Sequence, residues 1–232
     1  MILDIGVIII IAFAPSLFWL WFFYKQDTFE VEPLRVILKM FLLGMIITIP
    51  AIIFEEVFSL IFSVFVLTVI IGPIIEELSK FSIVREIEYN DIKFDEPVEG
   101  VTYSVSTALG FATIENIIYL LYQPSLLSIA FTGAIRALFT IPAHAIFAIF
   151  WGYALGIVKF HAAGKTGKYL IISGLLLGIV VHCLFNFLLM QNLAGFAVLI
   201  LVVFPLMLWF AEEDIHKSLI ITYKIKHKNL NN

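Results

Sequence analysis

The chain has very little cysteine and very little charge, and each shortage excludes a class of protein. Cys183 is its one cysteine, which excludes an intrachain disulfide framework and a cysteine-based zinc motif. Charged residues make up 14% of the 232 residues, and hydrophobic residues make up 62%. A soluble domain of this size has too little interior to bury that much apolar surface. No stretch is typical of a nucleic-acid-binding arm, so the expected surroundings are a lipid bilayer, and we predict a multi-pass protein of the cell membrane.

The apolar segments predict an all-α fold, a polytopic membrane bundle of about seven transmembrane helices. A span needs about 20 apolar residues, so a chain of this length can hold that number in one domain. We expect a single transmembrane domain over residues 1–210, followed by a charged cytoplasmic tail over 211–232 that holds a short helix at the membrane surface. The predicted helices cover residues 2–24, 36–54, 57–84, 98–122, 125–160, 168–190 and 194–210.

The positions of Lys and Arg predict the orientation of the bundle. Of the 14 Lys and Arg residues, all except Arg136 lie beside the first, third and fifth connections or in the tail. Loops rich in Lys and Arg stay in the cytoplasm, which predicts an N-terminus outside and a cytoplasmic C-terminus. Splitting residues 125–160 at Pro142 into two spans would break this alternation. That segment is therefore predicted to form one long, tilted and kinked helix.

Four of the predicted helices carry ionisable or amide side chains within their apolar stretches. A charge near the centre of a bilayer costs about 3 kcal/mol on insertion scales, so several of them in one bundle indicate a polar site inside the membrane. A doubled carboxylate on an apolar helix is a candidate general base, and histidine is a candidate proton donor or acceptor. The polar residues are Glu76, Glu77 and Lys80 on the third helix, Glu115 and Asn116 on the fourth, Arg136 and His144 on the fifth, and His182 and Asn186 on the sixth.

Helical spacing places several of these side chains on shared faces. Lys80 lies one turn from both glutamates of the third helix, although it could instead extend its ammonium group to the membrane surface. His182 and Asn186 are four residues apart and point the same way. Arg136 needs a partner inside the membrane, and Glu115 is the predicted one, although this pair could be purely structural.

Two further features are predicted to have no catalytic role. Glu55 and Glu56 also form a doubled carboxylate, but they fall at a predicted external turn where solvent would satisfy both. The fifth and sixth helices each carry a pair of glycines four residues apart, which predicts close packing between helices.

The sequence lacks the motifs of three known types of intramembrane protease. It has no His-Glu-x-x-His for the zinc-dependent site-2 type and no Gly-x-Ser-Gly for the rhomboid type. It has no Gly-x-Gly-Asp, and no aspartate between residues 28 and 90, which excludes the presenilin type. The groups that remain for chemistry are glutamates, histidines and an asparagine.

Four short motifs follow one another on successive helices. They are Glu-Glu-x-x-Lys at 76–80, Phe-x-x-x-Glu-Asn at 111–116, His-Ala at 144–145 and His-x-x-x-Asn at 182–186. In this order they resemble the PrsW family of intramembrane proteases, which is related to the CAAX-processing and bacteriocin-processing membrane proteases. The CAAX branch typically has Glu-Glu-x-x-x-Arg and Phe-x-x-x-His instead. The resemblance covers about residues 70–190, the expected catalytic core.

The resemblance implies an intramembrane endopeptidase that cleaves membrane-anchored proteins, such as single-span anti-sigma factors. It also implies a catalytic core and a supporting set of residues around it. The implied core is Glu76, Glu77 and His182, supported by Glu115, His144 and Asn186. The other polar residues, Lys80, Asn116 and Arg136, are expected to assist them.

Two mechanisms fit these residues. In the preferred one no cofactor is required: Glu76 or Glu77 takes a proton from water, histidine and asparagine side chains stabilise the oxyanion, and a glutamate orients a histidine. In the alternative, His144, His182 and one glutamate bind zinc and leave a water in the fourth position. The sequence leaves open which glutamate is the general base.

Other functions remain open on the same residues. A proton-coupled transporter would use buried Glu, His and Lys side chains as an ion relay, spread along a path rather than around one water. A non-catalytic membrane scaffold would tolerate the loss of Glu76 and Glu77. A prenyl-protein protease of the CAAX type is disfavoured by the motif differences. For the hydrolase, we expect a water-filled cavity that opens on the cytoplasmic side.

Overall fold

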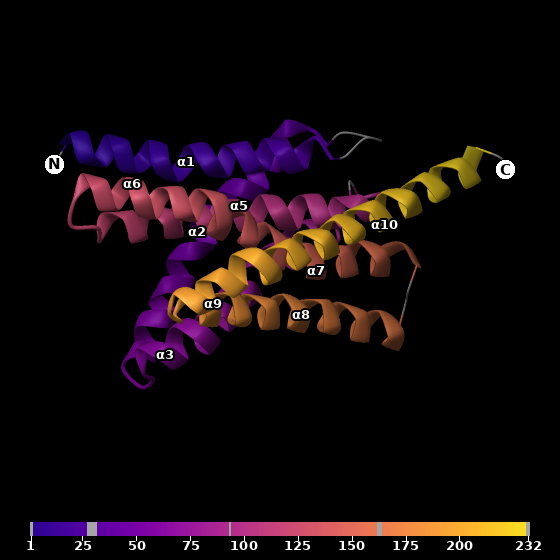
Figure 1. Cartoon of the computed structure of the whole chain (residues 1–232). Coiled ribbons are helices and arrows are strands. Elements are labelled where there is room, and N and C mark those ends of the chain that lie inside the picture. The colour runs from indigo at the N-terminus through magenta and orange to yellow at the C-terminus, as the bar shows by residue number, and fades with distance from the viewer. Residues whose placement is uncertain (1, 27–31, 93, 162–163, 231–232) are drawn as a thin grey trace.

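The computed structural model describes residues 2–26, 32–92, 94–161 and 164–230, and this part consists of helices and their connections, without a β-strand (Figure 1). The predicted all-α class is confirmed. The α-helices are α1 (Ile2–Tyr24), α2 (Leu34–Ser59), α3 (Val64–Val66), α4 (Gly72–Ile83), α5 (Pro97–Leu121), α6 (Leu126–Ile135), α7 (Ile141–His161), α8 (Lys165–Leu189), α9 (Leu193–Val198) and α10 (Phe204–Leu230). The π-helical segments among the described residues are Leu67–Ile71, Val84–Glu88, Arg136–Thr140 and Leu199–Val203.

These elements form seven continuous helical rods in the described part of the chain, because π-helical segments join α3 to α4, α6 to α7 and α9 to α10. Six rods are long and apolar enough to cross a membrane. The seventh, over residues 64–88, carries the doubled carboxylate and lysine of the predicted site. The segment 126–161 is a single rod, as predicted, and its π-helical part ends just before Pro142, which cannot donate a backbone hydrogen bond.

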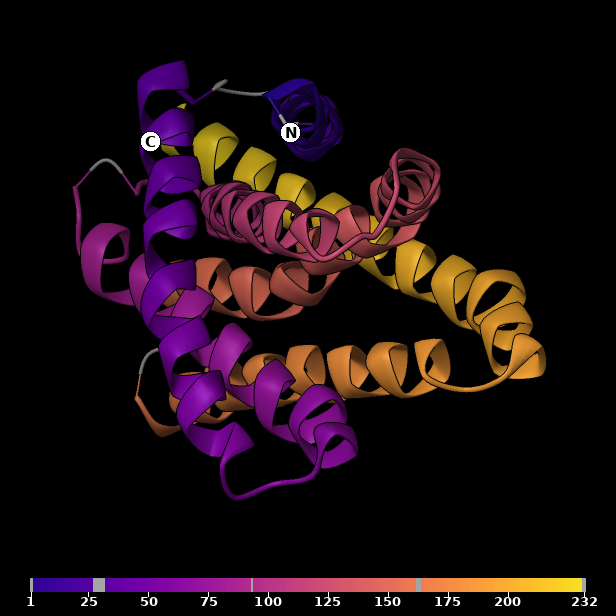
Figure 2. The same cartoon turned by 90° about the vertical axis from the view of Figure 1, so that its left-hand side faces the viewer.

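The rods alternate in direction, so their connections gather at two ends of the bundle (Figures 1 and 2). The N-terminus of α1 and the connections after α2, α5 and α8 lie at one end, on the left of Figure 1. The C-terminal ends of α1 and α7, the N-terminal ends of α2, α5 and α8, and the C-terminal part of α10 lie at the other end. We call this second end the basic end, because most of the Lys and Arg residues lie in the helix ends that meet there or in the C-terminal part of α10. The alternation agrees with the seven-span prediction, and the side of the membrane that each end faces stays a prediction.

The second connection lies later in the chain than predicted. Helix α2 continues to Ser59, and the next rod begins after Ser63, whose hydroxyl accepts a hydrogen bond from the Val66 N–H. Glu55 and Glu56 therefore lie inside α2, and the prediction of a turn at these residues is wrong. Glutamate is a good helix former, so a pair of glutamates does not by itself end a helix.

The later start of the third rod changes the depth of its polar residues. In a rod that covers residues 64–88, Glu76 is the middle residue and Lys80 lies one turn further on. Lys80 has an exposed fraction of 0%, so it neither flanks a connection nor reaches the membrane surface. The alternative of an extended, surface-seeking lysine is therefore wrong.

The last rod is longer than predicted. Helix α10 passes through residue 210 without a break and ends at Leu230. Its sequence has neither glycine nor proline after Pro205, so nothing interrupts the helical pattern. Ser218 and Thr222 are buried against the bundle. This part of the chain thus continues the last rod and does not form a separate surface helix.

Helices α5, α7 and α8 pack with their backbones in contact. A Cβ atom on Gly100 of α5 would lie 2.4 Å from the carbonyl oxygen of Gly152 in α7. A Cβ atom on Gly178 of α8 would lie 2.7 Å from the carbonyl oxygen of Phe147 in α7. The close packing predicted from the glycine pairs is confirmed, and it brings the polar side chains of these helices within reach of one another.

Candidate active site

Lys80 lies at the centre of the polar residues and is completely buried. Its ammonium nitrogen is 3.2 Å from Glu76 Oε2 and 2.8 Å from Glu77 Oε1 on the same helix, and 2.9 Å from His144 Nδ1 on α7. The ring of Phe111 in α5 has its centroid 4.4 Å from the same nitrogen. One buried cation thus compensates the doubled carboxylate and connects α4 to α7.

Glu77 has no exposed surface, and both of its carboxylate oxygens have partners. Besides the contact with Lys80, Oε1 lies 3.0 Å from His182 Nδ1 of α8, and Oε2 accepts a hydrogen bond of 3.1 Å from the Trp151 indole N–H. The His182 ring stacks on Phe147 with a centroid separation of 4.3 Å. An anionic Glu77 accepts from Nδ1–H, so we assign the tautomer of His182 that turns its unprotonated Nε2 toward the cavity described below.

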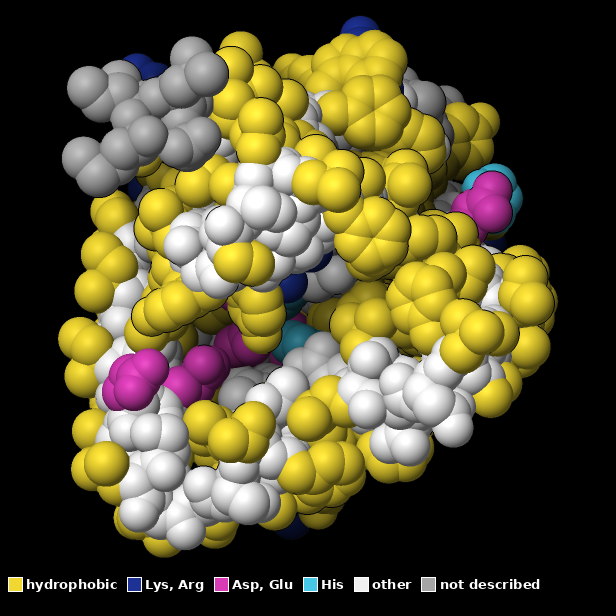
Figure 3. All heavy atoms as spheres, turned by 60° about the vertical axis from the view of Figure 1, so that its left-hand side comes forward, with side chains coloured by type: hydrophobic (Ala, Val, Ile, Leu, Met, Phe, Trp, Pro, Cys, Tyr) yellow, Lys and Arg dark blue, Asp and Glu magenta, His cyan; other side chains and the backbone are white. Residues whose placement is uncertain are grey.

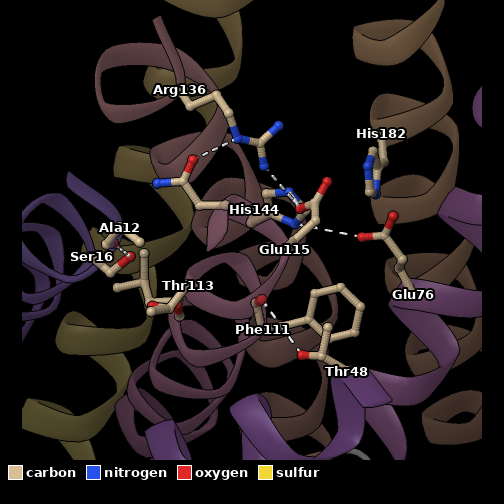
Figure 4. Close-up of polar contacts among 12 residues, drawn as sticks. Ala12, Ser16, Thr48, Glu76, Phe111, Thr113, Glu115, Arg136, His144 and His182 are labelled. Atoms are coloured by element: carbon tan, nitrogen blue, oxygen red, sulfur yellow. Dashed lines mark hydrogen bonds and ion pairs between the residues drawn. The ribbon is translucent and has the colours of Figure 1, made fainter. Parts of the chain in front are cut away.

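His144 is held on both sides of its ring (Figure 4). Its Nδ1 faces the donors of Lys80 and must accept, which assigns the proton to Nε2. Nε2 lies 2.8 Å from Glu115 Oε2, and Arg136 Nη2 lies 3.3 Å from the same oxygen, which confirms the predicted pairing of Arg136 with Glu115. The rings of His144 and His182 have centroids 5.2 Å apart.

Arg136 connects this cluster to α5 and α1. Its Nε donates a hydrogen bond of 2.8 Å to Asn116 Oδ1, and its guanidinium carbon lies 4.1 Å from the centroid of the Tyr119 ring. Asn116 is fully buried, and its amide donates to the backbone carbonyl of Ile11 in α1 at 3.4 Å. Arg136 begins a π-helical segment, a feature that is common at functional sites. Both assisting residues predicted for this region therefore contact each other.

Asn186 binds a backbone carbonyl that has lost its usual hydrogen-bond partner. In the π-helical turn before α4, each carbonyl accepts from the N–H five residues later, so the partner of the Thr68 carbonyl would be residue 73. That residue is proline and has no N–H. The side-chain amide of Asn186 donates to the Thr68 carbonyl at 3.0 Å instead. The second N–H of this amide and its oxygen remain available for other contacts.

A cavity of about 420 Å³ opens among these side chains, and acidic, basic and histidine groups are visible inside the hollow in Figure 3. Its apolar walls come from α2, α5, α7 and α8. Glu76 borders the cavity, whereas the fully buried Glu77 lies behind it. The polar lining consists of Thr48, Glu55, Glu56, Thr68, Glu76, Glu115, Tyr119, Arg136, Thr140, His144, His182 and Asn186.

The cavity opens at the end of the bundle opposite to the basic end. Its walls include Glu56, near the end of α2, and Met190, at the end of α8, and the connections that follow both helices lie at that end (Figure 1). A hollow is visible in the view with that end turned forward (Figure 3). The predicted opening of the cavity to the cytoplasm therefore does not agree with the predicted cytoplasmic position of the basic end, and both stay predictions. The predicted opening followed from placing Glu76 close to the basic end, whereas Glu76 lies midway along its rod.

Every polar residue predicted for the site lies in this one connected region. Sequence reasoning missed Trp151 and Glu55. Trp151 is seven residues from His144, two helical turns away on the same face, but the apolar run around it offered no other signal. Glu55 was assigned to a turn that does not exist at this position. The convergence of these groups on one cavity favours a hydrolase over an ion relay spread along a path.

Three of the lining side chains could hold a metal ion. One ligand atom from each of Glu76, His144 and His182 lies within 4.8 Å of the other two, and all three residues are buried. Two histidines and a glutamate are a common ligand set of catalytic zinc, in which carboxylates usually support the histidines from behind. These residues therefore fit a metal ion. Lys80 would have to withdraw, because its Nζ lies 3.2 Å from Glu76 and 2.9 Å from His144.

A carboxylate and two imidazoles around a cavity, inside a bundle of membrane-spanning helices, define an intramembrane hydrolase. Comparison with known proteins narrows this class to the intramembrane proteases. A family model described as "PrsW family intramembrane metalloprotease" matches residues 32–210. The chain belongs to the PrsW family.

Individual relatives match over most of the chain. Protease PrsW of Geobacillus kaustophilus is 34% identical over 182 residues, which cover 77% of this chain and 78% of the relative. Protease PrsW of Clostridioides difficile is 31% identical over 219 residues, with 91% and 90% covered, and that of Oceanobacillus iheyensis is 33% identical over 221 residues, with 94% of both covered. No solved structure matches this chain. The chain is thus a multi-pass membrane protease whose substrate is a protein within the membrane.

Proposed function

We propose that the chain is an endopeptidase in which Glu76 activates the water that attacks the peptide bond. The observation that carries this assignment is the difference between the two neighbouring glutamates. Glu76 borders the cavity with 10% of its side chain exposed, and its contact with Lys80 is 3.2 Å long. Glu77 is fully buried, and its oxygens are occupied by Lys80, His182 and Trp151. Of the two, only Glu76 can meet a water molecule and take its proton.

Donors for the oxyanion come from α8. His182 is oriented by Glu77 and turns Nε2 toward the cavity, so the ring can donate to the oxyanion when it carries a second proton. The amide N–H of Asn186 that does not bind the Thr68 carbonyl is a second donor. Glu76 then passes its proton to the amine that leaves.

The groups around His144 keep the reacting carboxylate in position. Lys80 contacts both Glu76 and the His144 ring, so it holds α4 and α7 in register. Glu115 holds the opposite side of the ring, and Arg136 holds Glu115. We propose that these are positioning residues, whose contacts are formed before the substrate arrives.

A zinc-dependent form of the same protease is the second candidate, because the ligand atoms of Glu76, His144 and His182 converge and the family description names a metalloprotease. When bound there, zinc would supply a Lewis acid and activate water near neutral pH. The carboxylates behind the two rings would then keep both imidazoles in ligand geometry. We favour the form without metal, because Lys80 already provides a positive charge between Glu76 and His144.

We propose a single-span membrane protein as the substrate, of the anti-sigma-factor kind that the family resemblance implies. The reacting groups line a cavity of about 420 Å³ between the helices. In an α-helix each peptide carbonyl is hydrogen-bonded to the N–H four residues later, within the backbone of the helix. We therefore propose that the segment around the scissile bond unwinds to an extended chain as it enters the cavity.

The test is a cleavage assay with the purified chain and a panel of single-span proteins reconstituted in liposomes. The native chain should cut at least one of them at a defined bond, identified by mass spectrometry. Glu76→Gln and His182→Ala should not cut it. Equal cleavage by the native chain and both variants would refute the proposal, and cleavage products absent throughout would favour a transporter or scaffold.

A chelation experiment separates the two mechanisms. In the form without metal, 1,10-phenanthroline leaves the cleavage rate unchanged, and the purified chain holds no stoichiometric metal by elemental analysis. The zinc-dependent form predicts loss of activity, recovery on adding zinc, and a metal content that falls in His144→Ala.

A further inference from the structure

Glu55 and Glu56 take no part in the proposed reaction, yet both line the cavity. They lie in the last turns of α2, at the open end, and acidic side chains form a row from the rim of the hollow into its interior in Figure 3. The lining contains four glutamates against one guanidinium, that of Arg136. A cavity with this balance of charge attracts a cationic group.

The inner carboxylates are compensated and the outer ones are not. Glu76 contacts Lys80 at 3.2 Å, and Glu115 contacts Arg136 at 3.3 Å. Within the described residues, neither the Glu55 nor the Glu56 carboxylate takes part in a hydrogen bond or ion pair, although Glu55 is half-buried. A carboxylate removed from bulk water without a partner is costly, so a cation that enters the cavity gains by pairing with it.

The wall beside Glu55 leaves space for such a partner. Gly72 begins α4, and a Cβ atom there would lie 3.8 Å from Glu55 Oε1. Because this residue is a glycine, it adds no side chain to the wall beside the carboxylate, and both residues line the cavity. The third rod thus borders the outer part of the cavity with backbone only at this point.

The guanidinium of Arg136 indicates that the molecule bound in the cavity also carries a hydrogen-bond acceptor. Arg136 is 7% exposed and lines the cavity, and its Nη2 is buried without a hydrogen bond of acceptable geometry to any described residue. Its 3.3 Å contact with Glu115 is an ionic contact that is not aligned as a hydrogen bond. A buried N–H group without an acceptor is costly, so Arg136 Nη2 gains from a hydrogen bond to an acceptor on the substrate. A peptide carbonyl is such an acceptor.

We infer that Glu55, assisted by Glu56, selects substrates that carry a lysine or arginine close to the scissile bond. The inference rests on the proposed function, because the cavity must hold the segment that is cleaved. The basic side chain lies in the space beside Gly72 and pairs with Glu55, while a backbone carbonyl of the same segment accepts from Arg136. A neutral side chain at that position leaves Glu55 uncompensated, which lowers the affinity of the complex.

The experiment uses matched single-span substrates that differ at one position at a time around the mapped scissile bond, with Lys, Gln or Glu at that position. The native chain should cleave the Lys member with a kcat/KM on the order of tenfold above that of the Gln member at one such position, as expected for a hydrogen-bonded charge pair. Glu55→Gln should bring this ratio to about one. Glu55→Lys should reverse the preference in favour of the Glu member.

Glu86→Gln is the matched control, since it removes the same charge from an exposed residue outside the cavity and should leave the Lys-to-Gln ratio intact. Equal kcat/KM for Lys and Gln members at every position, or a preference that persists in Glu55→Gln, would overturn the inference and leave the proposed function standing. Reversal in Glu55→Lys would also prove that this variant is folded. If no member of any charge is cleaved, the proposed function fails and the inference fails with it.

Discussion

Replacing Glu77 with glutamine should damage both the fold and the activity, whereas the same change at Glu76 should damage activity alone. Glu77 is fully buried and accepts from Lys80, His182 and Trp151 at 2.8, 3.0 and 3.1 Å. A glutamine amide would turn N–H groups toward at least one of these donors and remove the charge that compensates the ammonium. Removing one partner of a buried ion pair costs about 3–5 kcal/mol, which is the expected loss of unfolding free energy.

The loss at Glu76 should be smaller for a reason visible in the structure. Its carboxylate borders the cavity and has its shortest contact, 3.2 Å, with Lys80, which keeps the closer contact with Glu77 in the variant. Glu76→Gln should therefore cost about 1 kcal/mol, the usual net value of one hydrogen bond. Its turnover should nevertheless vanish, because Glu77 is buried behind the cavity and Glu115 is held between His144 and Arg136.

For Glu77→Gln, the catalytic loss follows from the His182 ring. Without an anionic acceptor at Nδ1, the ring no longer keeps the orientation that aims Nε2 into the cavity. Losing one donor to the oxyanion lowers kcat by about 10²–10³-fold. Thermal unfolding in detergent and single-substrate kinetics measure the two effects on the same preparations. A Glu77→Gln variant as stable as the native chain, or a Glu76→Gln variant that unfolds much earlier, would contradict the assignment of roles.

Three other changes test separate contacts. Arg136→Met should lower kcat by about tenfold or more, because the carboxylate that orients an imidazole loses its partner, and Arg136→Lys should recover part of that loss in kinetics that resolve kcat from KM. Gly178→Val should lower stability by about 1–3 kcal/mol, because it forces α8 away from α7, whereas Gly6→Val, at a site with nothing within 4 Å, should not change the unfolding temperature. Asn186→Leu should lower both stability, by about 1–3 kcal/mol, and activity; adding Pro73→Ala returns an N–H to the orphaned carbonyl and should restore the stability but not the activity.

The membership of the polar site could be predicted from the sequence, because burying a charge in lipid is costly enough that each such residue is informative. Helical spacing was sufficient to place His182 beside Asn186, and the need to compensate a buried guanidinium was sufficient to pair Arg136 with Glu115. Both deductions require only short-range geometry and charge. The Lys and Arg residues occur near alternate connections, which also predicted that successive rods run in opposite directions.

The depth of the polar residues along their helices, and the end at which the cavity opens, could not be predicted in the same way. Helix ends are weakly encoded when the residues at the break are good helix formers, and a shift of seven residues at the start of the third rod moved Glu76 from one end of the bundle to its middle. The same shift changed Glu55 from a supposed turn residue into part of the cavity wall. Trp151 was missed because a tryptophan within an apolar segment is normally interpreted as a core residue without a polar role.

The π-helical turn at Arg136–Thr140 makes the site sensitive to the number of residues as well as to their identity. Such a turn holds one residue more than a regular one, so it behaves as a single-residue insertion that the long helix has absorbed. Each residue of an α-helix advances the chain by about 100° around the axis. Deleting one residue between Arg136 and Thr140 would leave both of these side chains and His144 present. It would nevertheless rotate Arg136 by roughly that angle relative to His144. The number of residues in this turn is therefore as important for the site as their identity.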